Sequence, residues 1–187
     1  PPMSITSFLK IIGRGSKGAS NLDRDQAKEV FTQILGGNVS DLELGAFCIA
    51  MRIKGESASE LMGFMDALKP HLNLLNPGTR HTIILPSYNG ARKQANLTPL
   101  LAGMLSAIGF IVLVQGVEKD QTRVTSYAIF ESLGWPILNG TNAFGSLLNL
   151  NTPIFCPLSV ISPALQKLLD VREQIGLRNT GHVLPKL

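Results

Sequence analysis

The spacing of apolar residues changes once along this chain of 187 residues, close to residue 80. Before that point, apolar side chains recur at intervals of three and four, the period of an amphipathic α-helix. After it, short runs of apolar and β-branched residues alternate with helical patterns, and each short run predicts a buried strand. The pattern therefore predicts two domains, a small helical domain over residues 1–79 and an α/β domain over residues 80–187.

Helix starts in the first domain carry a local signal, a Ser or Asp followed three residues later by Glu or Gln. At this spacing each side chain can accept a hydrogen bond from the backbone N–H of the other residue, an arrangement called a capping box. The pairs are Asp23 with Gln26, Ser40 with Glu43, and Ser57 with Glu60. They predict helices that end near Leu35, Arg52 and Lys69, after a first helix that carries Ile5, Phe8, Leu9 and Ile12. The segment 13–18 is rich in Gly and cations but lacks the spacing of a nucleotide phosphate loop, so we expect a flexible surface connection.

In the second domain, three short apolar runs predict strands, and four longer patterns predict helices. The strands are Thr82–Leu85, Ile111–Val114 and Pro153–Cys156, and the helices are Pro99–Ile108, Ser126–Leu133, Asn142–Leu148 and Pro163–Ile175. Strands that alternate with helices imply βαβ crossovers, and hence a parallel sheet with helices on both faces. Three strands make a small core, and a new element begins after residue 178, so we expect the chain to be a fragment of a longer domain.

The loop between the first strand and the following helix concentrates the candidate chemistry. Thr98 and Pro99 predict an N-cap followed by Pro at the first helical position. Unpaired backbone N–H groups and the positive end of the helix dipole can hold an anion there. Arg92 and Lys93 add positive charge, and Gly90 allows close approach of the backbone. We therefore expect phosphate to bind at residues 86–98.

Charge supports an anionic partner for the second domain. Residues 1–79 contain eight Lys and Arg and eight Asp and Glu, whereas residues 80–187 contain nine and five, so the whole net charge of +4 lies in the second domain. This distribution suits a phosphorylated small molecule or a nucleic acid, with ordinary solubility charge as the alternative.

Composition also bears on the cellular compartment. No apolar run is long enough to span a bilayer, and the first residues lack the basic start of a secretory signal. Cys48 and Cys156 lie far apart in apolar surroundings and are expected to be buried thiols in a reducing environment. We expect a cytoplasmic protein that has no association with membranes.

Several stretches resemble anthranilate phosphoribosyltransferases. Gly45–Ser57 and Arg172–Arg178 are similar to the corresponding helical stretches of that family, and Leu85–Leu101 resembles more specifically its YbiB branch. Gln115–Val117 and Thr122–Val124 support the same branch. The resemblance implies a helical domain that forms a homodimer, and an α/β domain of the nucleoside phosphorylase/phosphoribosyltransferase type that continues beyond residue 187.

The motifs of the biosynthetic enzymes are altered in this sequence. Their Gly-Thr-Gly-Gly-Asp loop corresponds to Ser87–Ala91, with one Gly left, and their Lys-His-Gly-Asn motif corresponds to Val114–Val117. The Lys that meets phosphate and the His that meets anthranilate in those enzymes are therefore replaced. Asn96 and one hydroxyl of their Asn-x-Ser-Thr motif remain, and Arg172 matches an Arg that faces the aromatic carboxylate. The carboxylates that hold Mg²⁺ in the family would lie beyond residue 187.

Three hypotheses follow. The first is a nucleic-acid-binding protein, largely without sequence preference, that needs no cofactor or metal and has Tyr88 stacked on a base. Its binding residues are Tyr88, Asn89, Gly90, Arg92, Lys93, Asn96, Thr98 and Arg123.

The second hypothesis is a phosphoribosyltransferase that uses phosphoribosyl pyrophosphate and Mg²⁺ with an altered acceptor. Gln115, Arg172 and Arg178 would then mark the position of the former acceptor site. The third is a non-catalytic interaction protein that uses its helical domain.

Overall fold

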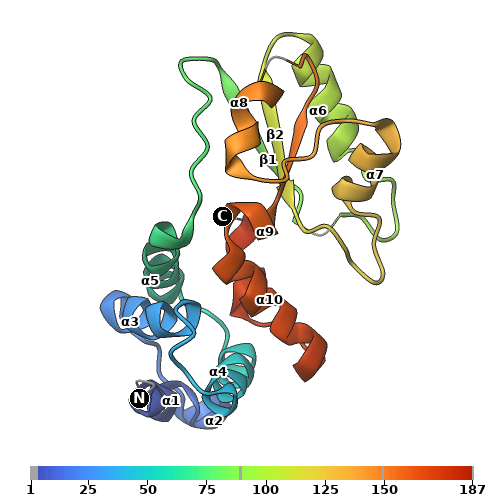
Figure 1. Ribbon diagram of the computed structural model, residues 1–187. Helices are drawn as coiled ribbons and strands as arrows, with labels where there is room; N and C mark the ends of the chain where they lie inside the picture. The colour runs from blue at the N-terminus through green and yellow to red at the C-terminus, as the bar shows by residue number, and fades with distance from the viewer. Residues whose placement is uncertain (1–3, 89, 149, 187) are drawn as a thin grey trace. The chain divides into compact units, whose positions relative to one another are not determined.

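A computed structural model describes residues 4–88, 90–148 and 150–186 (Figure 1). The chain divides into two compact units. The helical unit consists of the described residues of Pro1–Leu72 and Ala164–Leu184, and the α/β unit consists of those of Asn73–Pro163 and Pro185–Leu187. Within the described residues, no helix has the length and apolar character needed to cross a membrane.

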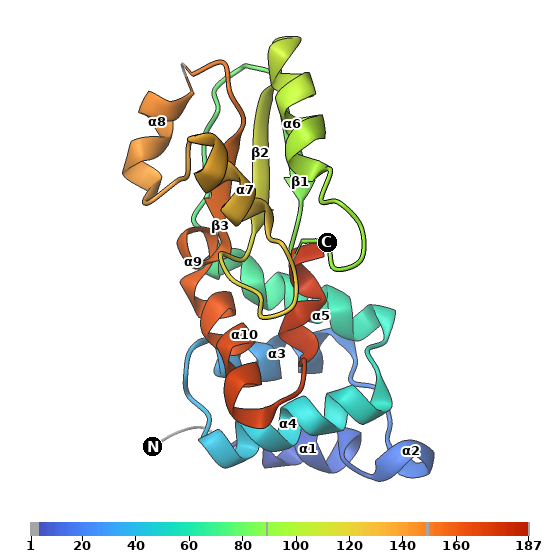
Figure 2. The same ribbon diagram turned by 90° about the vertical axis from the view of Figure 1, so that its right-hand side faces the viewer.

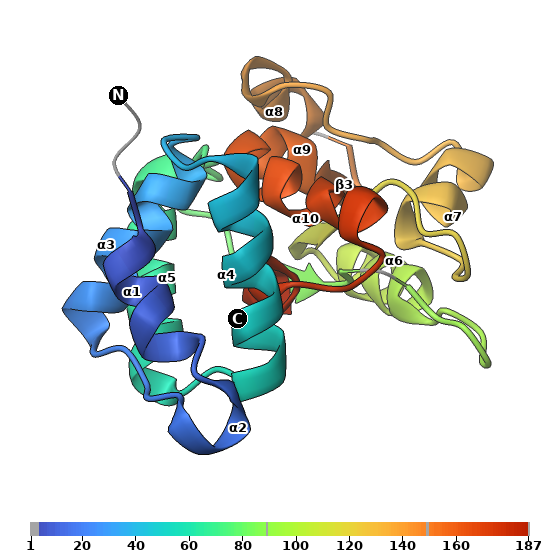
Figure 3. The ribbon, with the colours of Figure 1, turned by 90° about the horizontal axis from the view of Figure 1, so that it is seen from below.

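The helical unit contains six helices among its described residues (Figure 3). They are α1 (Thr6–Ile12), α2 (Gly15–Gly18), α3 (Arg24–Leu35), α4 (Asp41–Lys54), α5 (Ala58–Leu68) and α10 (Pro163–Ile175), with 3-10 turns at Lys69–His71 and Thr180–His182. All three predicted capping boxes are present with both hydrogen bonds formed. The connection expected at residues 13–18 instead contains the short helix α2, which begins at Gly15 with a positive φ of 74°.

Aromatic side chains form the centre of the helical core. The ring centroids of Phe31 and Phe64 lie 4.7 Å apart, and Phe47 packs edge-on against Phe64 at 6.2 Å. Helices α3 and α5 approach closely because Gly63 has no side chain, and a Cβ at this position would overlap the carbonyl oxygen of Arg24. Dense packing of this kind stabilises the unit because its large apolar side chains are removed from water.

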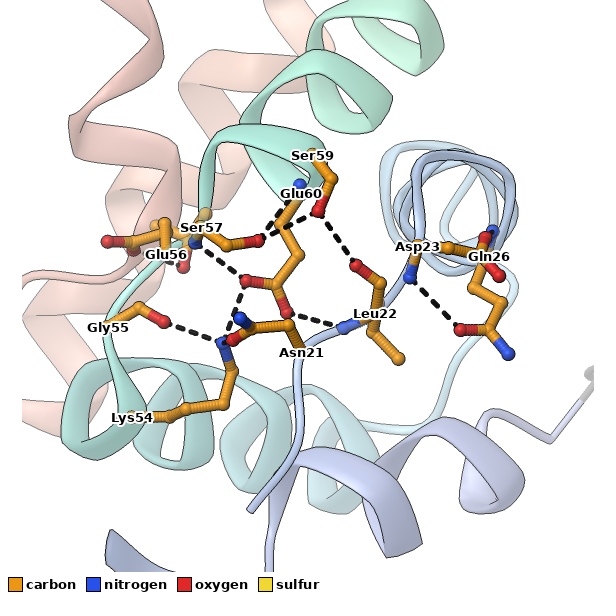
Figure 4. A network of polar contacts seen from close by, with 11 residues as sticks. Asn21, Leu22, Asp23, Gln26, Lys54, Gly55, Glu56, Ser57, Ser59 and Glu60 are labelled. Atoms are coloured by element: carbon orange, nitrogen blue, oxygen red, sulfur yellow. Dashed lines mark hydrogen bonds and ion pairs between the residues drawn. The ribbon is translucent and has the colours of Figure 1, made fainter.

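A buried ion pair joins the ends of α4 and α5 to the segment before α3 (Figure 4). The carboxylate of Glu60, which is fully buried, accepts hydrogen bonds from Lys54 Nζ at 2.7 Å, from the Leu22 N–H at 2.9 Å and from the Ser57 N–H at 2.8 Å. Lys54 Nζ also donates to Asn21 Oδ1 and to the Gly55 carbonyl. Burial raises the pKa of Glu60, but the hydrogen bonds from Lys54, Leu22 and Ser57 outweigh it and lower the pKa below its usual value.

The boundary between the units differs from the one expected from the sequence. Residues 80–187 were expected to form one domain, but Ala164–Leu184 belong to the helical unit. One hydrogen bond joins this segment to the N-terminal helices, because Thr180 Oγ1 donates to Glu56 Oε1 at 2.8 Å. A second holds the segment together, because Asn179 Nδ2 donates to the Leu168 carbonyl at 2.7 Å.

The α/β unit is built on a parallel sheet in the order β1-β2-β3, which confirms the predicted fold class (Figure 2). Its strands are β1 (Thr82–Pro86), β2 (Ile111–Gly116) and β3 (Ile154–Pro157). Its helices are α6 (Thr98–Ala107), α7 (Ser126–Leu133), α8 (Phe144–Leu147) and α9 (Leu158–Ile161), with 3-10 turns at Thr141–Ala143 and Leu184–Lys186. Helix α9 follows directly after β3.

Alternate residues of the strands face opposite sides of the sheet, and each side has its own core. On one side, Val112, Val114 and Phe155 pack with side chains of α6 and α7, including Ala102 and Phe130. On the other side, a second set packs with residues of α8. That set contains Leu113, Leu138, Phe144, Ile154 and Cys156. Helices therefore cover both faces, as predicted.

The predicted start of α6 is wrong by one residue. The helix begins at Thr98 itself, and the N-cap position is Leu97, which makes no side-chain capping hydrogen bond. The side chain of Asn96 takes over part of this role, because its Oδ1 accepts a hydrogen bond from the Thr98 N–H at 3.3 Å. Asn side chains readily accept such local hydrogen bonds, so a side chain outside the helix satisfies the first N–H group of α6.

Candidate functional site

A polar cluster lies where β1 and β2 end. Ser87 Oγ and Ser126 Oγ are 2.6 Å apart, and Asn96 Nδ2 donates to Ser126 Oγ at 3.0 Å and to the Val124 carbonyl at 3.2 Å. Ser126 is completely buried and Ser87 nearly so. We call Ser87, Asn96 and Ser126 the hydroxyl–amide cluster.

Two helices begin beside this cluster. Ser126 is the first residue of α7, and its neighbour Thr125 caps that helix by accepting from the Ala128 N–H at 3.2 Å. Asn96 lies two residues before the start of α6. The first N–H groups of both helices, with the positive ends of the helix dipoles, therefore lie near the same hydroxyls. Such an arrangement favours an anion, and in particular a phosphate.

The loop after β1 lies closely against the loop after β2. Ala91 and Val124 exchange two backbone hydrogen bonds, of 3.2 and 3.0 Å, as an antiparallel bridge. Gly90 has a positive φ of 69°, and a Cβ at this position would overlap the Val124 carbonyl. Only Gly fits this backbone conformation and this contact, so the sequence requirement at residue 90 is steric.

The cations of the loop differ in exposure. Arg92 and Lys93 are exposed to solvent, whereas Arg123 is partly buried and its guanidinium lies 3.5 Å from the Gly90 carbonyl. Tyr88 is only 7% exposed, and its carbonyl accepts from the Val117 N–H at 2.8 Å. Its ring therefore presents no open face on which a base could stack in this structure. Asn89 lies outside the described residues.

The residues expected at the former acceptor site belong to different units. Gln115 lies in β2, where its carbonyl accepts from the Ser87 N–H at 2.7 Å. Arg172 is a residue of α10, and Arg178 follows that helix, so both lie in the helical unit. The structure describes each unit by itself, and the grouping of these three residues remains a prediction.

Ser126 was not predicted as a site residue, and Ser87 was predicted only as part of the phosphate loop at residues 86–98. A signal for Ser126 is present in the sequence, because Thr125 and Ser126 precede a helical pattern soon after a strand. No local signal connects Ser87 to Ser126, which is 39 residues away.

The described residues do not form a metal site by themselves. Among residues 4–88, 90–148 and 150–186, no group of three His, Cys, Asp or Glu side chains could hold a metal ion. The segment 87–98 contains no carboxylate in its sequence. These residues do not fit Mg²⁺ without further ligands.

A separate apolar groove lies on the helical unit. It has a volume of about 350 Å³ and is formed by residues of α1, the start of α2, and α4. Its lining residues are Leu9, Ile12, Gly13, Gly15, Ala46, Ile49, Ala50, Ile53 and Lys54. The homodimer expected through the N-terminal helices remains a prediction, and this groove is the surface on which we would test it.

Comparison with known proteins connects the fold to one group of enzymes. Residues 6–71 match a family model described as the helical bundle domain of a glycosyl transferase family. An uncharacterized protein of Escherichia coli, YbiB, is 47% identical over 99% of this chain and 58% of its own length. Anthranilate phosphoribosyltransferase from Methanopyrus kandleri is 28% identical over 97% of this chain and 52% of its own length.

Solved structures give the same fold. Anthranilate phosphoribosyltransferase from Thermus thermophilus superposes with a TM-score of 0.71 at 20% identity, over 89% of this chain and 51% of that one. The Saccharomyces cerevisiae enzyme in complex with PRPP and Mg superposes with a TM-score of 0.72 at 15% identity, over 100% of this chain and 56% of that one. The chain thus has the anthranilate phosphoribosyltransferase fold and spans about half the length of these relatives.

Proposed function

We propose that this chain carries the phosphate-binding part of a phosphoribosyltransferase-like protein, and that its ligand is phosphoribosyl pyrophosphate or a close phosphate ester. The observation that carries the proposal is the hydroxyl–amide cluster at the ends of β1 and β2, beside the first residues of α6 and α7. The similarity to anthranilate phosphoribosyltransferases, one of them solved with PRPP and Mg, supports this choice of ligand.

The chemistry of the cluster suits phosphate oxygens. Hydroxyl and amide groups donate hydrogen bonds to them, and the N–H groups of two helix starts add to the attraction. Asn96 and Ser126 are bonded to each other in this structure, so they must exchange that bond for bonds to the ligand. Ligand binding therefore requires a rearrangement of the loop after β1, which lowers the apparent affinity.

We propose an acceptor other than anthranilate. Gln115 stands where the resemblance places the His that meets anthranilate, and Val114 stands where it places the Lys that meets phosphate. Loss of a side-chain cation removes electrostatic stabilisation from phosphoribosyl transfer. The exposed side chains of Arg92 and Lys93 are the remaining cations of this loop that a phosphate can reach.

Calorimetric titration of phosphoribosyl pyrophosphate, with and without Mg²⁺, tests the proposal. Ser126→Ala removes a hydroxyl of the cluster, and Ser132→Ala is a matched control on the same helix, where an exposed Oγ donates only to the Ala128 carbonyl. We expect saturable binding that Ser126→Ala weakens at least tenfold and Ser132→Ala leaves unchanged. Absence of binding to the folded protein, or equal affinities for both variants, would contradict the proposal.

A second function, binding of the nucleic-acid backbone, is favoured by a specific observation. Arg92 and Lys93 are exposed beside a loop that is closed by the pairing of Ala91 with Val124. Surface cations suffice for contacts to the phosphates of a nucleic acid, whereas a small ligand needs the cluster behind them. The burial of Tyr88 disfavours base stacking and leaves phosphate contacts as the mode of binding.

Fluorescence anisotropy of a labelled single-stranded oligonucleotide over a salt series tests this second function. Removal of Arg92 or Lys93 should reduce the salt slope by about one each. Lys28→Ala, which removes an exposed cation from α3, is the control. Binding with an unchanged slope in both loop variants would place the nucleic-acid surface elsewhere.

A further inference from the structure

A carboxylate lies at the same edge of the sheet as the hydroxyl–amide cluster, but between a different pair of strands. Glu118 follows the end of β2 by two residues, and its Oε1 accepts a hydrogen bond of 2.8 Å from Ser159 Oγ. Ser159 follows the end of β3 by two residues. The last residues of these strands, Gly116 and Pro157, are partners in the parallel register. The hydrogen bond therefore fixes the carboxylate between the ends of β2 and β3.

The loop after β2 connects this carboxylate to the cluster. Thr125 Oγ1 donates to the Glu118 carbonyl at 3.1 Å and accepts from the Ala128 N–H at 3.2 Å. The next residue is Ser126, a member of the hydroxyl–amide cluster. Neighbouring strands of a sheet are about 4.8 Å apart, so the gap between β1 and β2 and the gap between β2 and β3 are close together. Ligand groups that bind side by side can therefore contact the cluster and the carboxylate at once.

Charge is divided between these two positions. Arg92 and Lys93 follow β1, and Arg123 contacts the loop after β1. Glu118 is partly buried on the β3 side, and the ion pairs of the described residues do not include it. A carboxylate that is partly removed from water without a cation is costly unless its oxygens accept hydrogen bonds. Ser159 supplies one such bond, and a carboxylate has room for more.

We propose that Glu118 selects the acceptor, and that this acceptor is an uncharged aromatic or heteroaromatic ring with N–H donors on its polar edge. The inference rests on the proposed function, since it takes the hydroxyl–amide cluster as the phosphate site. Hydrogen bonds from N–H groups to a carboxylate are about twice as strong as bonds between neutral groups. An acceptor that carries its own carboxylate is repelled at this position. The position that favours N–H donors therefore disfavours anthranilate.

A matched pair of probes tests the proposal, anthranilate and its carboxamide, 2-aminobenzamide. The two molecules share the ring and the amine, and they differ in whether the second group is an anion or an N–H donor. Ligand-detected NMR titrations at neutral pH give the dissociation constant of each probe. The protein is expressed from its complete reading frame, and each probe is titrated with and without phosphoribosyl pyrophosphate.

Three variants accompany the wild type. Glu118→Gln removes the charge and keeps an acceptor for the Ser159 hydroxyl, and Ser159→Ala removes the bond that fixes the carboxylate. Glu131→Gln is the matched control, because Glu131 is an exposed carboxylate on α7 in the same unit. Circular dichroism gives the thermal midpoint of each protein.

The wild type and Glu131→Gln should bind the carboxamide at least about tenfold more tightly than anthranilate. Glu118→Gln should bring the two dissociation constants to within about threefold of each other, and Ser159→Ala should reduce the difference in part. A folded wild type that binds neither probe, or that binds both equally, would overturn the proposal. A full preference in Glu118→Gln together with a lower thermal midpoint would also overturn it, because Glu118 would then only tether its loop to α9.

Binding of phosphoribosyl pyrophosphate, measured by calorimetry on the same samples, separates failure of this inference from failure of the proposed function. Binding of that ligand without a preference for the carboxamide would overturn the role of Glu118 and leave the phosphate site in place. A preference that depends on Glu118, in a protein that does not bind phosphoribosyl pyrophosphate, would support the role of Glu118 and contradict the proposed function.

Discussion

Replacement of Glu60 by Gln should destabilise the helical unit strongly, because the carboxylate is fully buried and both of its oxygens accept hydrogen bonds. It accepts from Lys54 Nζ at 2.7 Å and from the N–H groups of Leu22 and Ser57 at 2.9 and 2.8 Å. An amide of the same shape has one acceptor oxygen, and its NH₂ group would face a donor. The substitution would also leave the ammonium of Lys54, whose side chain is 7% exposed, without its counter-charge.

The magnitude follows from the burial of both partners. Removal of one member of a buried ion pair costs about 3–5 kcal/mol in the free energy of unfolding. Lys54 Nζ keeps its bonds to Asn21 Oδ1 and to the Gly55 carbonyl, so we expect the lower end, about 3 kcal/mol. The control is the exposed pair of Lys69 with Asp66, in which Lys69 is 66% exposed. Lys69→Met should cost less than about 1 kcal/mol.

Urea unfolding followed by circular dichroism at 222 nm measures both variants. This signal is the suitable one, because the single Trp, Trp135, lies in the α/β unit and its fluorescence reports on that unit. Lys54→Met combined with Glu60→Leu should recover only part of the loss, since the Leu22 and Ser57 N–H groups would stay buried without an acceptor. A loss for Glu60→Gln no larger than that for Lys69→Met would refute the assignment of Glu60 as a structural charge.

Further predictions concern the loop, the surface of the helical unit, the acid limit and the thiols. Gly90→Ala should weaken phosphate binding and lower the thermal midpoint, because the added Cβ meets a backbone carbonyl at a positive φ; unchanged values for both would contradict the steric requirement. Ile53→Glu places a charge in the apolar groove of the helical unit, so sedimentation should show a dimeric wild type and a monomeric variant. Hydrogen bonds from the Ser40 and Ser4 hydroxyls lower the pKa of Glu43 from 4.5 to about 2, so its stabilising effect is full above pH 4.5 and is lost as the pH falls toward 2. The difference in urea midpoint between wild type and Glu43→Gln should therefore shrink over that range. Burial raises the pKa of Cys48 to about 11 and that of Cys156 to about 12, so both thiols should react with a disulfide reagent at pH 8 only after unfolding.

The parts of the fold that depend on neighbouring residues could be predicted from the sequence. Capping boxes join residues three apart, and Asp23, Ser40 and Ser57 begin helices as expected. The parallel sheet follows from the alternation of strands and helices. Parallel strands cannot be joined by a short turn and need a long crossover connection, which a helix supplies. Gly134 follows α7 in the left-handed conformation, as is typical of a Gly at the end of a helix.

The parts that depend on distant contacts could not be predicted in this way. Ser87 meets Ser126 across 39 residues, and Thr180 meets Glu56 across 124, so no local pattern reveals either contact. Tyr88 was expected to be available for stacking because loops are commonly exposed, but packing of its loop buries it. Asn96 Nδ2 likewise donates to Ser126 Oγ and to the Val124 carbonyl, which are far away in the sequence, while its Oδ1 accepts from the Thr98 N–H at the start of α6.

An NMR titration of the ¹⁵N-labelled protein with phosphoribosyl pyrophosphate tests the central claim most directly, because it reports where the ligand binds. If the carboxyl end of the sheet is a phosphate site, the backbone N–H signals of Gly90, Thr98 and Ser126 should shift saturably. The signal of Lys28 in the helical unit should stay in place. Saturable shifts confined to other residues, or no shift at these three N–H groups at millimolar ligand, would contradict the claim.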